Sequence, residues 1–205
     1  MKKNKFKKEF LFFIIGIFLI LFGVYLSVFK KEPHFYIPFS IGLVITFIFI
    51  YNFISKKNIF EKWKIKNYVF FFFVLLVSCI IIDKIGFYLG YWIDNYFSFF
   101  DVFLKYVFEW AVPFIYFMIF LMIGLNIFEK KFSFWFSLVL SLIVFVIPLG
   151  FFTEYINLFS DSWIVLSMPF SNFRIGDFFV VFQLIGYPLM ALIPFVIYKI
   201  SEKIK

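Results

Sequence analysis

The chain has 205 residues, of which 64% are hydrophobic, with a mean hydropathy of +1.02 and a formal net charge of +8 at pH 7. Soluble domains contain roughly 45–50% apolar residues, so this composition excludes an ordinary soluble protein. One Cys and one His exclude an intramolecular disulfide and any site built from several thiols or histidines. The chain also lacks a phosphate-binding loop, a nucleophile elbow and a zinc-protease motif, so no cofactor and no metal are predicted.

Six apolar blocks follow one another along the chain, and each is long enough to cross a bilayer. They are predicted to be helices, because lipid offers no hydrogen-bond partner to exposed backbone groups. The predicted spans are 10–29, 35–55, 68–90, 102–128, 132–152 and 178–200. The first block has no small-residue cleavage site after it, so we expect a retained helix. Residues 1–205 are therefore predicted to form one all-α domain, a polytopic transmembrane bundle.

The distribution of charge predicts the orientation of this bundle. Fifteen of the twenty Lys and Arg residues lie at the N-terminus, in the loops after the second and fourth spans, or in the C-terminal tail. Positive residues gather on the cytoplasmic side of membrane proteins, so both termini are predicted to be cytoplasmic in the cell membrane. These cations flank the spans and form no separate basic domain. They therefore predict attraction to membrane lipid and no nucleic-acid partner.

The two longer connections on the outer side combine charges with aromatic residues. Residues 83–101 and 153–177 both contain acids, amides, Tyr and Trp. One interpretation is an interfacial belt, where Trp and Tyr anchor helices. The other is a lid over a polar cavity that opens outward, and its candidate substrate-binding residues are Trp92, Trp163, Arg174 and Asp177.

Two of these candidates also have simpler roles. Asp177 precedes the last predicted span and suits a helix N-cap, where a carboxylate complements the helix dipole. Arg174 is the only Arg in the chain. A guanidinium binds phosphate or carboxylate groups through two parallel hydrogen bonds, but pairing with Asp161 or Asp177 is an equal alternative.

A weak internal repeat links the third and fourth spans to the fifth and sixth. Asp83 precedes Trp92 by nine residues, and Glu154 precedes Trp163 by the same interval. A parallel repeat of 68–128 and 132–200 would place Asp83 and Glu154 at equivalent helix ends, facing one another. Paired carboxylates shift each other's proton affinity, which suits acid–base chemistry or cation capture. The alternative is that both are ordinary solvated acids at helix ends.

Glu109 is the third candidate catalytic residue, after Asp83 and Glu154. It lies about seven residues into the fourth predicted span, or roughly 10 Å along a helix axis. An ionisable group at that depth is expected to face protein or water. Lys105 is four residues earlier on the same face, so a local ion pair is the simpler interpretation. Pro113 removes a backbone hydrogen bond from the carbonyl of Glu109 and is expected to kink the helix there.

The spacing of the acids and tryptophans resembles that of small membrane proteins of the carotenoid (lycopene) cyclase-domain type. The Asp83/Trp92 and Glu154/Trp163 pairs match the first part of that pattern, and the segment 175–179 is similar to the second part. The Pro-x-Glu-Glu signature of that family does not occur in this chain. The resemblance implies a polytopic helical architecture over residues 68–200 and a lipid or isoprenoid substrate.

Three functions remain open from the sequence. The first is a multi-pass inner-membrane protein with an outward-facing polar cavity and no assigned activity. The second is a membrane-embedded enzyme that modifies a lipid or isoprenoid through carboxylate acid–base chemistry, with Trp faces stabilising a developing cation. The third is a small transporter or ion-conducting subunit in which Glu109 is the intramembrane coupling group.

Overall fold

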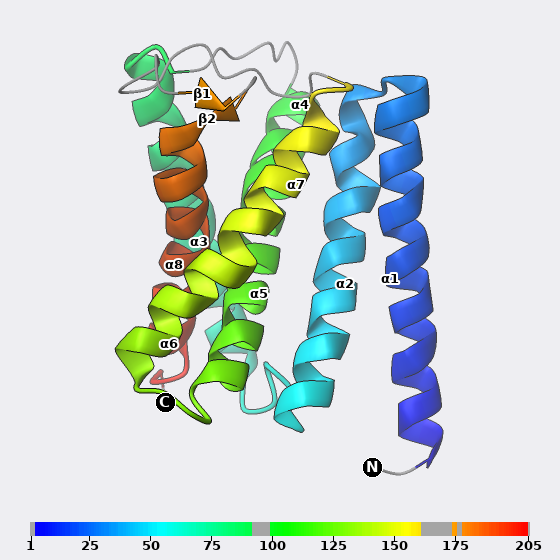
Figure 1. Ribbon diagram of the computed structural model, residues 1–205, viewed down its shortest axis with the longest axis vertical. Coiled ribbons are helices and arrows are strands. Elements are labelled where there is room, and N and C mark those ends of the chain that lie inside the picture. The colour runs from blue at the N-terminus through cyan, green and yellow to red at the C-terminus, as the bar shows by residue number, and fades with distance from the viewer. Residues whose placement is uncertain (1–2, 92–98, 161–173, 176–177, 205) are drawn as a thin grey trace.

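The computed structural model describes residues 3–91, 99–160, 174–175 and 178–204. Within them, six helices are long and apolar enough to cross a membrane: Glu9–Lys30, Pro33–Ser55, Ile65–Tyr88, Val102–Phe128, Phe134–Asn157 and Phe182–Ser201. Figure 1 shows these helices side by side along the long axis of the molecule. The predicted all-α bundle of six spans is confirmed.

Three spans are single α-helices, apart from one short turn. These are α1 (Lys3–Lys30), α2 (Tyr36–Ser55), which follows the 3₁₀ turn η1 (Pro33–Phe35), and α3 (Ile65–Tyr88). The other three spans each contain a π-helical segment. The fourth span consists of α4 (Phe99–Leu104), η2 (Lys105–Ala111) and α5 (Val112–Phe128). The fifth consists of α6 (Phe134–Ser141), η3 (Leu142–Val146) and α7 (Ile147–Asn157). The sixth consists of η4 (Phe182–Gly186) and α8 (Tyr187–Ser201).

Two predicted boundaries differ most from the structure. The fifth span continues to Asn157 instead of residue 152, and the sixth begins at Phe182 instead of residue 178. Residues 178 and 179 form β2 (Phe178–Phe179), which pairs antiparallel with β1 (Arg174–Ile175). Hydropathy ended the fifth span too early because its last turns carry polar side chains that are buried against other helices. Glu154 is consequently part of a span and not of a connection.

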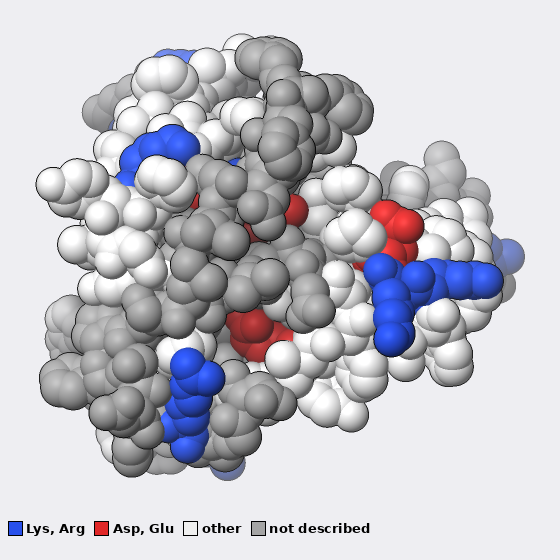
Figure 2. Space-filling model, turned by 90° about the horizontal axis from the view of Figure 1, so that it is seen from above, with Lys and Arg blue, Asp and Glu red and all other residues white. Residues whose placement is uncertain are grey.

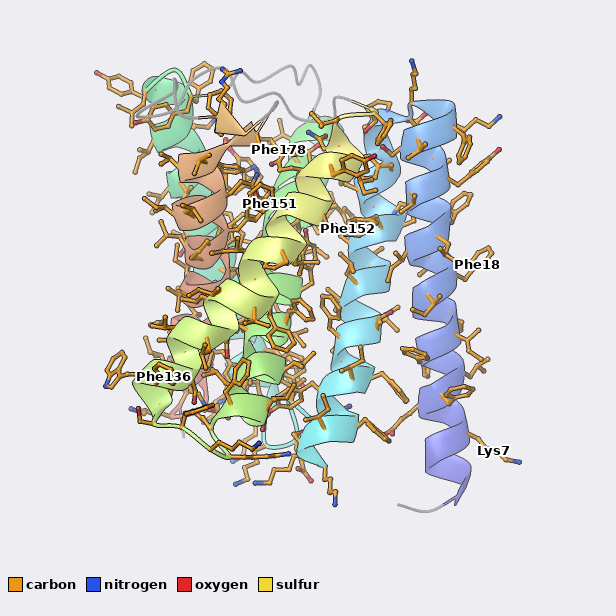
Figure 3. All side chains as sticks on the ribbon, in the orientation of Figure 1. Lys7, Phe18, Phe136, Phe151, Phe152 and Phe178 are labelled. Carbon is orange, nitrogen blue, oxygen red and sulfur yellow. The ribbon has the colours of Figure 1, made fainter. Side chains whose placement is uncertain are left out.

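The helix α5 lies at the centre of the bundle. In the span Val102–Phe128, 72% of the most apolar stretch is buried, compared with 17% in Glu9–Lys30. The helices α2, α6 and α8 all pack against α5, whereas α1 packs mainly against α2. Phe18 of α1 and Phe136 of α6 point away from the bundle (Figure 3) and are largely exposed. In a membrane protein such side chains face lipid, so exposure here does not mean contact with water.

Small residues allow α1 and α2 to approach closely. A Cβ atom at Gly42 would lie 2.7 Å from the carbonyl oxygen of Gly16, and one at Gly23 would lie 2.6 Å from the Cβ of Phe39. Neither distance leaves room for a side chain. Close backbone packing over small residues is a common way for transmembrane helices to associate, because burial out of lipid provides little hydrophobic driving force.

The start of α1 and the end of α8 lie at the same end of the bundle (Figure 1). At this end Asn67 joins α3 to the chain after α8, since its amide donates to the carbonyl oxygens of Ser201 and Ile204 at 2.6 and 3.2 Å. The hydroxyl of Tyr198 donates to the carbonyl of Ile59 at 2.6 Å. The basic loop between α2 and α3 therefore lies at the end that also holds the termini. Its cytoplasmic position stays a prediction.

Candidate functional site

A buried ion pair joins α3 to η2 in the half of the bundle opposite the termini. Asp83 of α3 has no exposed surface, and the Nζ of Lys105 lies 2.8 Å from its Oδ1. The hydroxyl of Tyr106 donates to Oδ2 at 2.8 Å, and the Nζ of the more exposed Lys84 is 3.7 Å from the same oxygen. A buried carboxylate needs such partners, because an unpaired charge is very unfavourable away from water.

This ion pair lies within the apolar span and not at its end. Asp83 precedes the last residue of α3, Tyr88, by five positions, or about 7.5 Å along the axis. The side chain of Lys105 is 5% exposed, so its ammonium does not reach out to the interface. Ionisable residues held inside a membrane are rare and usually mark ion or substrate pathways. Asp83 and Lys105 are therefore functional candidates and not only helix-end charges.

A second polar contact joins α7 to α8. Glu154 is 8% exposed, and its Oε1 accepts a hydrogen bond of 2.6 Å from the hydroxyl of Tyr187. Gly150 lies one turn before Glu154, and a Cβ atom there would clash with the ring of Tyr187. Because Gly150 has no side chain, the ring of Tyr187 packs directly against the backbone of α7. In a helix an aromatic side chain points back toward the N-terminus, which directs this hydroxyl outward to Glu154.

The central helix adds a third hydroxyl near Glu154. Tyr116 of α5 is 1% exposed and lies close to the side chains of Thr153 and Glu154. The hydroxyl of Thr153 also donates to the carbonyl of Leu149 at 2.9 Å. Three helices, α5, α7 and α8, therefore contribute polar side chains around Glu154. Such a network satisfies groups that lipid would leave without partners.

The π-helical segments η2 and η4 adjoin these contacts, and all three π-helical segments end two residues before a proline. The residue before each proline donates to the fifth preceding carbonyl: Val112 to Val107, Ile147 to Leu142 and Tyr187 to Phe182. Prolines at 113, 148 and 188 have no N–H to donate. Two carbonyls in each span consequently lose the donor that a regular α-helix would provide. Single π-helical turns of this kind are frequent at functional sites.

The three candidate acids have different surroundings. Asp83 and Glu154 are buried and hydrogen-bonded, so the alternative of two solvated helix-end acids is wrong. Glu109 is half-buried in η2. The contacts above attach Asp83 to η2 and Glu154 to α8, and a direct encounter of the two carboxylates across a pseudo-twofold axis stays a prediction. Viewed onto the end of the bundle opposite the termini, some acidic atoms lie below their surroundings near the middle of the face, and other acidic atoms lie beside basic side chains toward one edge (Figure 2).

The candidate substrate-binding residues are only partly within the described chain. Arg174 is exposed in β1, and its guanidinium carbon lies 3.9 Å from the centroid of the Phe179 ring, a cation–π contact. Phe178 of the same hairpin packs against Phe151 of α7, with ring centroids 5.6 Å apart (Figure 3). Trp92, Trp163 and Asp177 lie outside the described residues.

Sequence reasoning missed the partners of the acids. Lys105 was expected to pair with Glu109 four residues later, which stays a prediction, and its ion pair with Asp83 on another helix was not predicted. Tyr106 and Tyr187 carried no signal beyond being tyrosines next to polar or kink-forming residues. The one available signal was Lys105 itself, since a cation within an apolar span requires an acid partner from somewhere in the fold.

Comparisons with protein-family models, with curated proteins and with solved structures give no match. The function therefore has to be inferred from the chemistry of the site.

Proposed function

We propose that this protein is a multi-pass protein of the cell membrane that moves a small ion or a proton through an outward-facing polar site between its third and sixth spans. Six apolar helices support the membrane location. The single observation that carries the proposal is the ion pair of Asp83 and Lys105, buried within apolar spans. Both termini are proposed to be cytoplasmic, as the distribution of lysines predicts.

The positions of the charges favour transport over a purely structural role. A structural helix contact needs no charge, because replacing a buried ion pair by apolar residues is often neutral or stabilising. Intramembrane carboxylates and lysines instead recur along ion and proton pathways. Asp83, Lys105 and Glu109 lie on α3 and η2, which pack against one another. They form the proposed route on the outer side.

The interrupted helices support the same proposal. Each of the three spans from the fourth to the sixth contains a π-helical segment followed by a proline. Freed backbone carbonyls within a membrane are tolerated only where protein, polar side chains or water can satisfy them. Broken helices at ion sites are a recurrent feature of secondary transporters. The segment η2 contains Lys105 and Glu109, and η4 directly precedes Tyr187, so two of the three interruptions adjoin the polar contacts.

Ion flux into liposomes tests this proposal. The purified protein is reconstituted with a pH-sensitive dye inside the vesicles, and an outward Na⁺, K⁺ or proton gradient is applied. We expect flux with the wild type. Asp83→Asn and Glu109→Gln should each lower the rate of flux at least tenfold, which corresponds to an increase of about 1.4 kcal/mol or more in the activation free energy. Glu129→Gln, an exposed acid at the opposite end, is the matched control. Absence of flux in the wild type, or equal flux in all variants, contradicts the proposal.

A lipid- or isoprenoid-modifying enzyme is the second candidate, and the contact between Glu154 and Tyr187 favours it. A carboxylate and a phenol in direct contact can hold and pass a proton, as acid–base catalysis requires. The resemblance to carotenoid cyclase-domain proteins supports the same substrate class. Lipids extracted from cells that express the wild type or Glu154→Gln test it by mass spectrometry. A lipid species that changes with the wild type and not with the variant supports the enzyme, and identical lipid profiles contradict it.

A further inference from the structure

The loop between α2 and α3 is folded against α8. Ile59 of this loop is 3% exposed, its N–H donates to Oδ1 of Asn52 at 3.3 Å, and its carbonyl accepts from the hydroxyl of Tyr198 at 2.6 Å. The ring of Trp63 stacks on the ring of Tyr198, with centroids 5.2 Å apart. In the first turn of α3, Asn67 donates to the carbonyl of Ser201. The backbone of the loop therefore holds its side chains at one defined place on the bundle.

This loop and the first turn of α3 carry positive charge that has no partner. The segment 56–66 contains one acid, Glu61, and five exposed lysines, so its net charge is +4: Lys56, Lys57, Lys62, Lys64 and Lys66. Within the described residues, none of these five ammonium groups forms an ion pair, whereas Lys84, Lys105 and Lys199 each have a carboxylate partner. The described chain therefore leaves this charge for something else to neutralise.

Folding brings further positive charge to the same place. Asn67 donates to the carbonyls of Ser201 and Ile204, and the exposed Lys203 lies between these two residues. These hydrogen bonds join uncharged groups, so they do not offset the repulsion between the lysines that they bring together. Such self-repulsion destabilises a compact state. An anion bound at this end should consequently stabilise the folded protein.

The position of the lysines favours a lipid headgroup as that anion. The helix α2 ends at Ser55 and α3 begins at Ile65, and both are apolar spans, so the loop lies where the chain leaves the apolar region. Ile65 is 82% exposed and lies between Lys64 and Lys66. At a membrane boundary an apolar side chain faces acyl chains, whereas lysines extend toward the headgroups. Clusters of about four to eight basic residues beside a membrane helix bind anionic lipid.

We propose that the segment 56–66 binds a phospholipid of net negative charge, with Lys64 and Lys66 at the headgroup phosphate and Ile65 against an acyl chain. A zwitterionic lipid also has a phosphate, but its own cation already neutralises that group. The bound lipid would neutralise the loop and so stabilise the contact between α3 and the end of α8. This inference does not depend on ion transport, because the proposed ion route lies at the opposite end of the bundle.

Thermal unfolding of the full-length protein in micelles of a neutral detergent tests the ligand. Midpoints are measured while phosphatidylglycerol or phosphatidylcholine is added, since a ligand that binds only the folded state raises the midpoint as its concentration rises. We expect phosphatidylglycerol to bind at least about tenfold more tightly, with a smaller difference at high salt, which screens exposed charges. Glycerol 3-phosphate has the phosphate without acyl chains. An equal rise with this soluble anion overturns the assignment to a lipid.

Double variants assign the preference to this segment. Lys64→Gln with Lys66→Gln should weaken the binding of phosphatidylglycerol by about tenfold or more, because each lysine near an anionic surface contributes about fivefold. Lys64→Arg with Lys66→Arg keeps both charges and should keep the affinity. Lys130→Gln with Lys131→Gln is the matched control, since it removes two exposed lysines from another loop at the same end of the bundle. Equal affinity of the wild type for both lipids, or equal losses in the two Gln variants, overturns the proposal.

Discussion

Replacing Lys105 by Met removes the cation from a carboxylate that has no exposed surface. The ammonium is 2.8 Å from Asp83, and both side chains are almost completely enclosed. Met keeps most of the volume of the Lys stem, so the main effect is the loss of charge. Removing one partner of a buried ion pair typically costs about 3–5 kcal/mol. The hydrogen bond from Tyr106 remains and offsets part of this cost, so we expect about 3 kcal/mol.

The double variant separates pairing from packing. With Asp83→Asn added to Lys105→Met, no uncompensated charge remains, and the loss of stability should fall to about 1–2 kcal/mol. The coupling is the sum of the two single losses minus the loss in the double variant, and it should therefore exceed about 1 kcal/mol. Unfolding free energies of the four proteins in mixed micelles or by steric trapping measure this value.

An exposed ion pair in the same protein serves as the control. Lys199 and Glu202 lie 3.1 Å apart at the end of α8, with side chains 52% and 39% exposed. Lys199→Met should change stability by no more than about 1 kcal/mol, because exposed pairs contribute little. If the Lys105 and Asp83 variants are additive, or if Lys105→Met is as mild as Lys199→Met, then the buried ion pair does not hold α3 against η2.

Three further predictions address the contacts of the other helices. Gly150→Val should destabilise the protein by about 1–3 kcal/mol and displace the ring of Tyr187, and unchanged stability would contradict the contact between Gly150 and that ring. Gly42→Leu should cost a similar amount, about 1–3 kcal/mol, by separating α1 from α2, and unchanged stability would contradict the close backbone contact. Reporter fusions after residue 57 should be active only with a cytoplasmic enzyme reporter, and activity of a periplasmic reporter there would reverse the proposed orientation.

The sequence identified the ionisable residues of the site more readily than their partners. Asp83, Glu109 and Glu154 were recognisable as candidates because an acid within or beside an apolar block is unusual. Their partners come from positions far along the chain: Lys105 and Tyr106 for Asp83, and Tyr187 for Glu154. Local spacing suggests only near neighbours on one helix, such as Lys105 with Glu109, and that pairing stays a prediction. The π-helical segment η2 was not predicted, because no residue type specifies it.

The number, type and approximate bounds of the spans follow from the sequence by itself. The free energy of transferring a helix into lipid depends on its own side chains and its length. A long run of apolar residues therefore predicts a membrane helix whatever the other helices are. The tertiary structure decided which helix is central, where Gly150 makes room for Tyr187, and which charges are enclosed by protein. Those features depend on contacts between residues distant in the chain, and lipid-facing and protein-facing positions are equally apolar in this sequence. Hydropathy alone therefore cannot distinguish the two faces of a helix, whereas packing does.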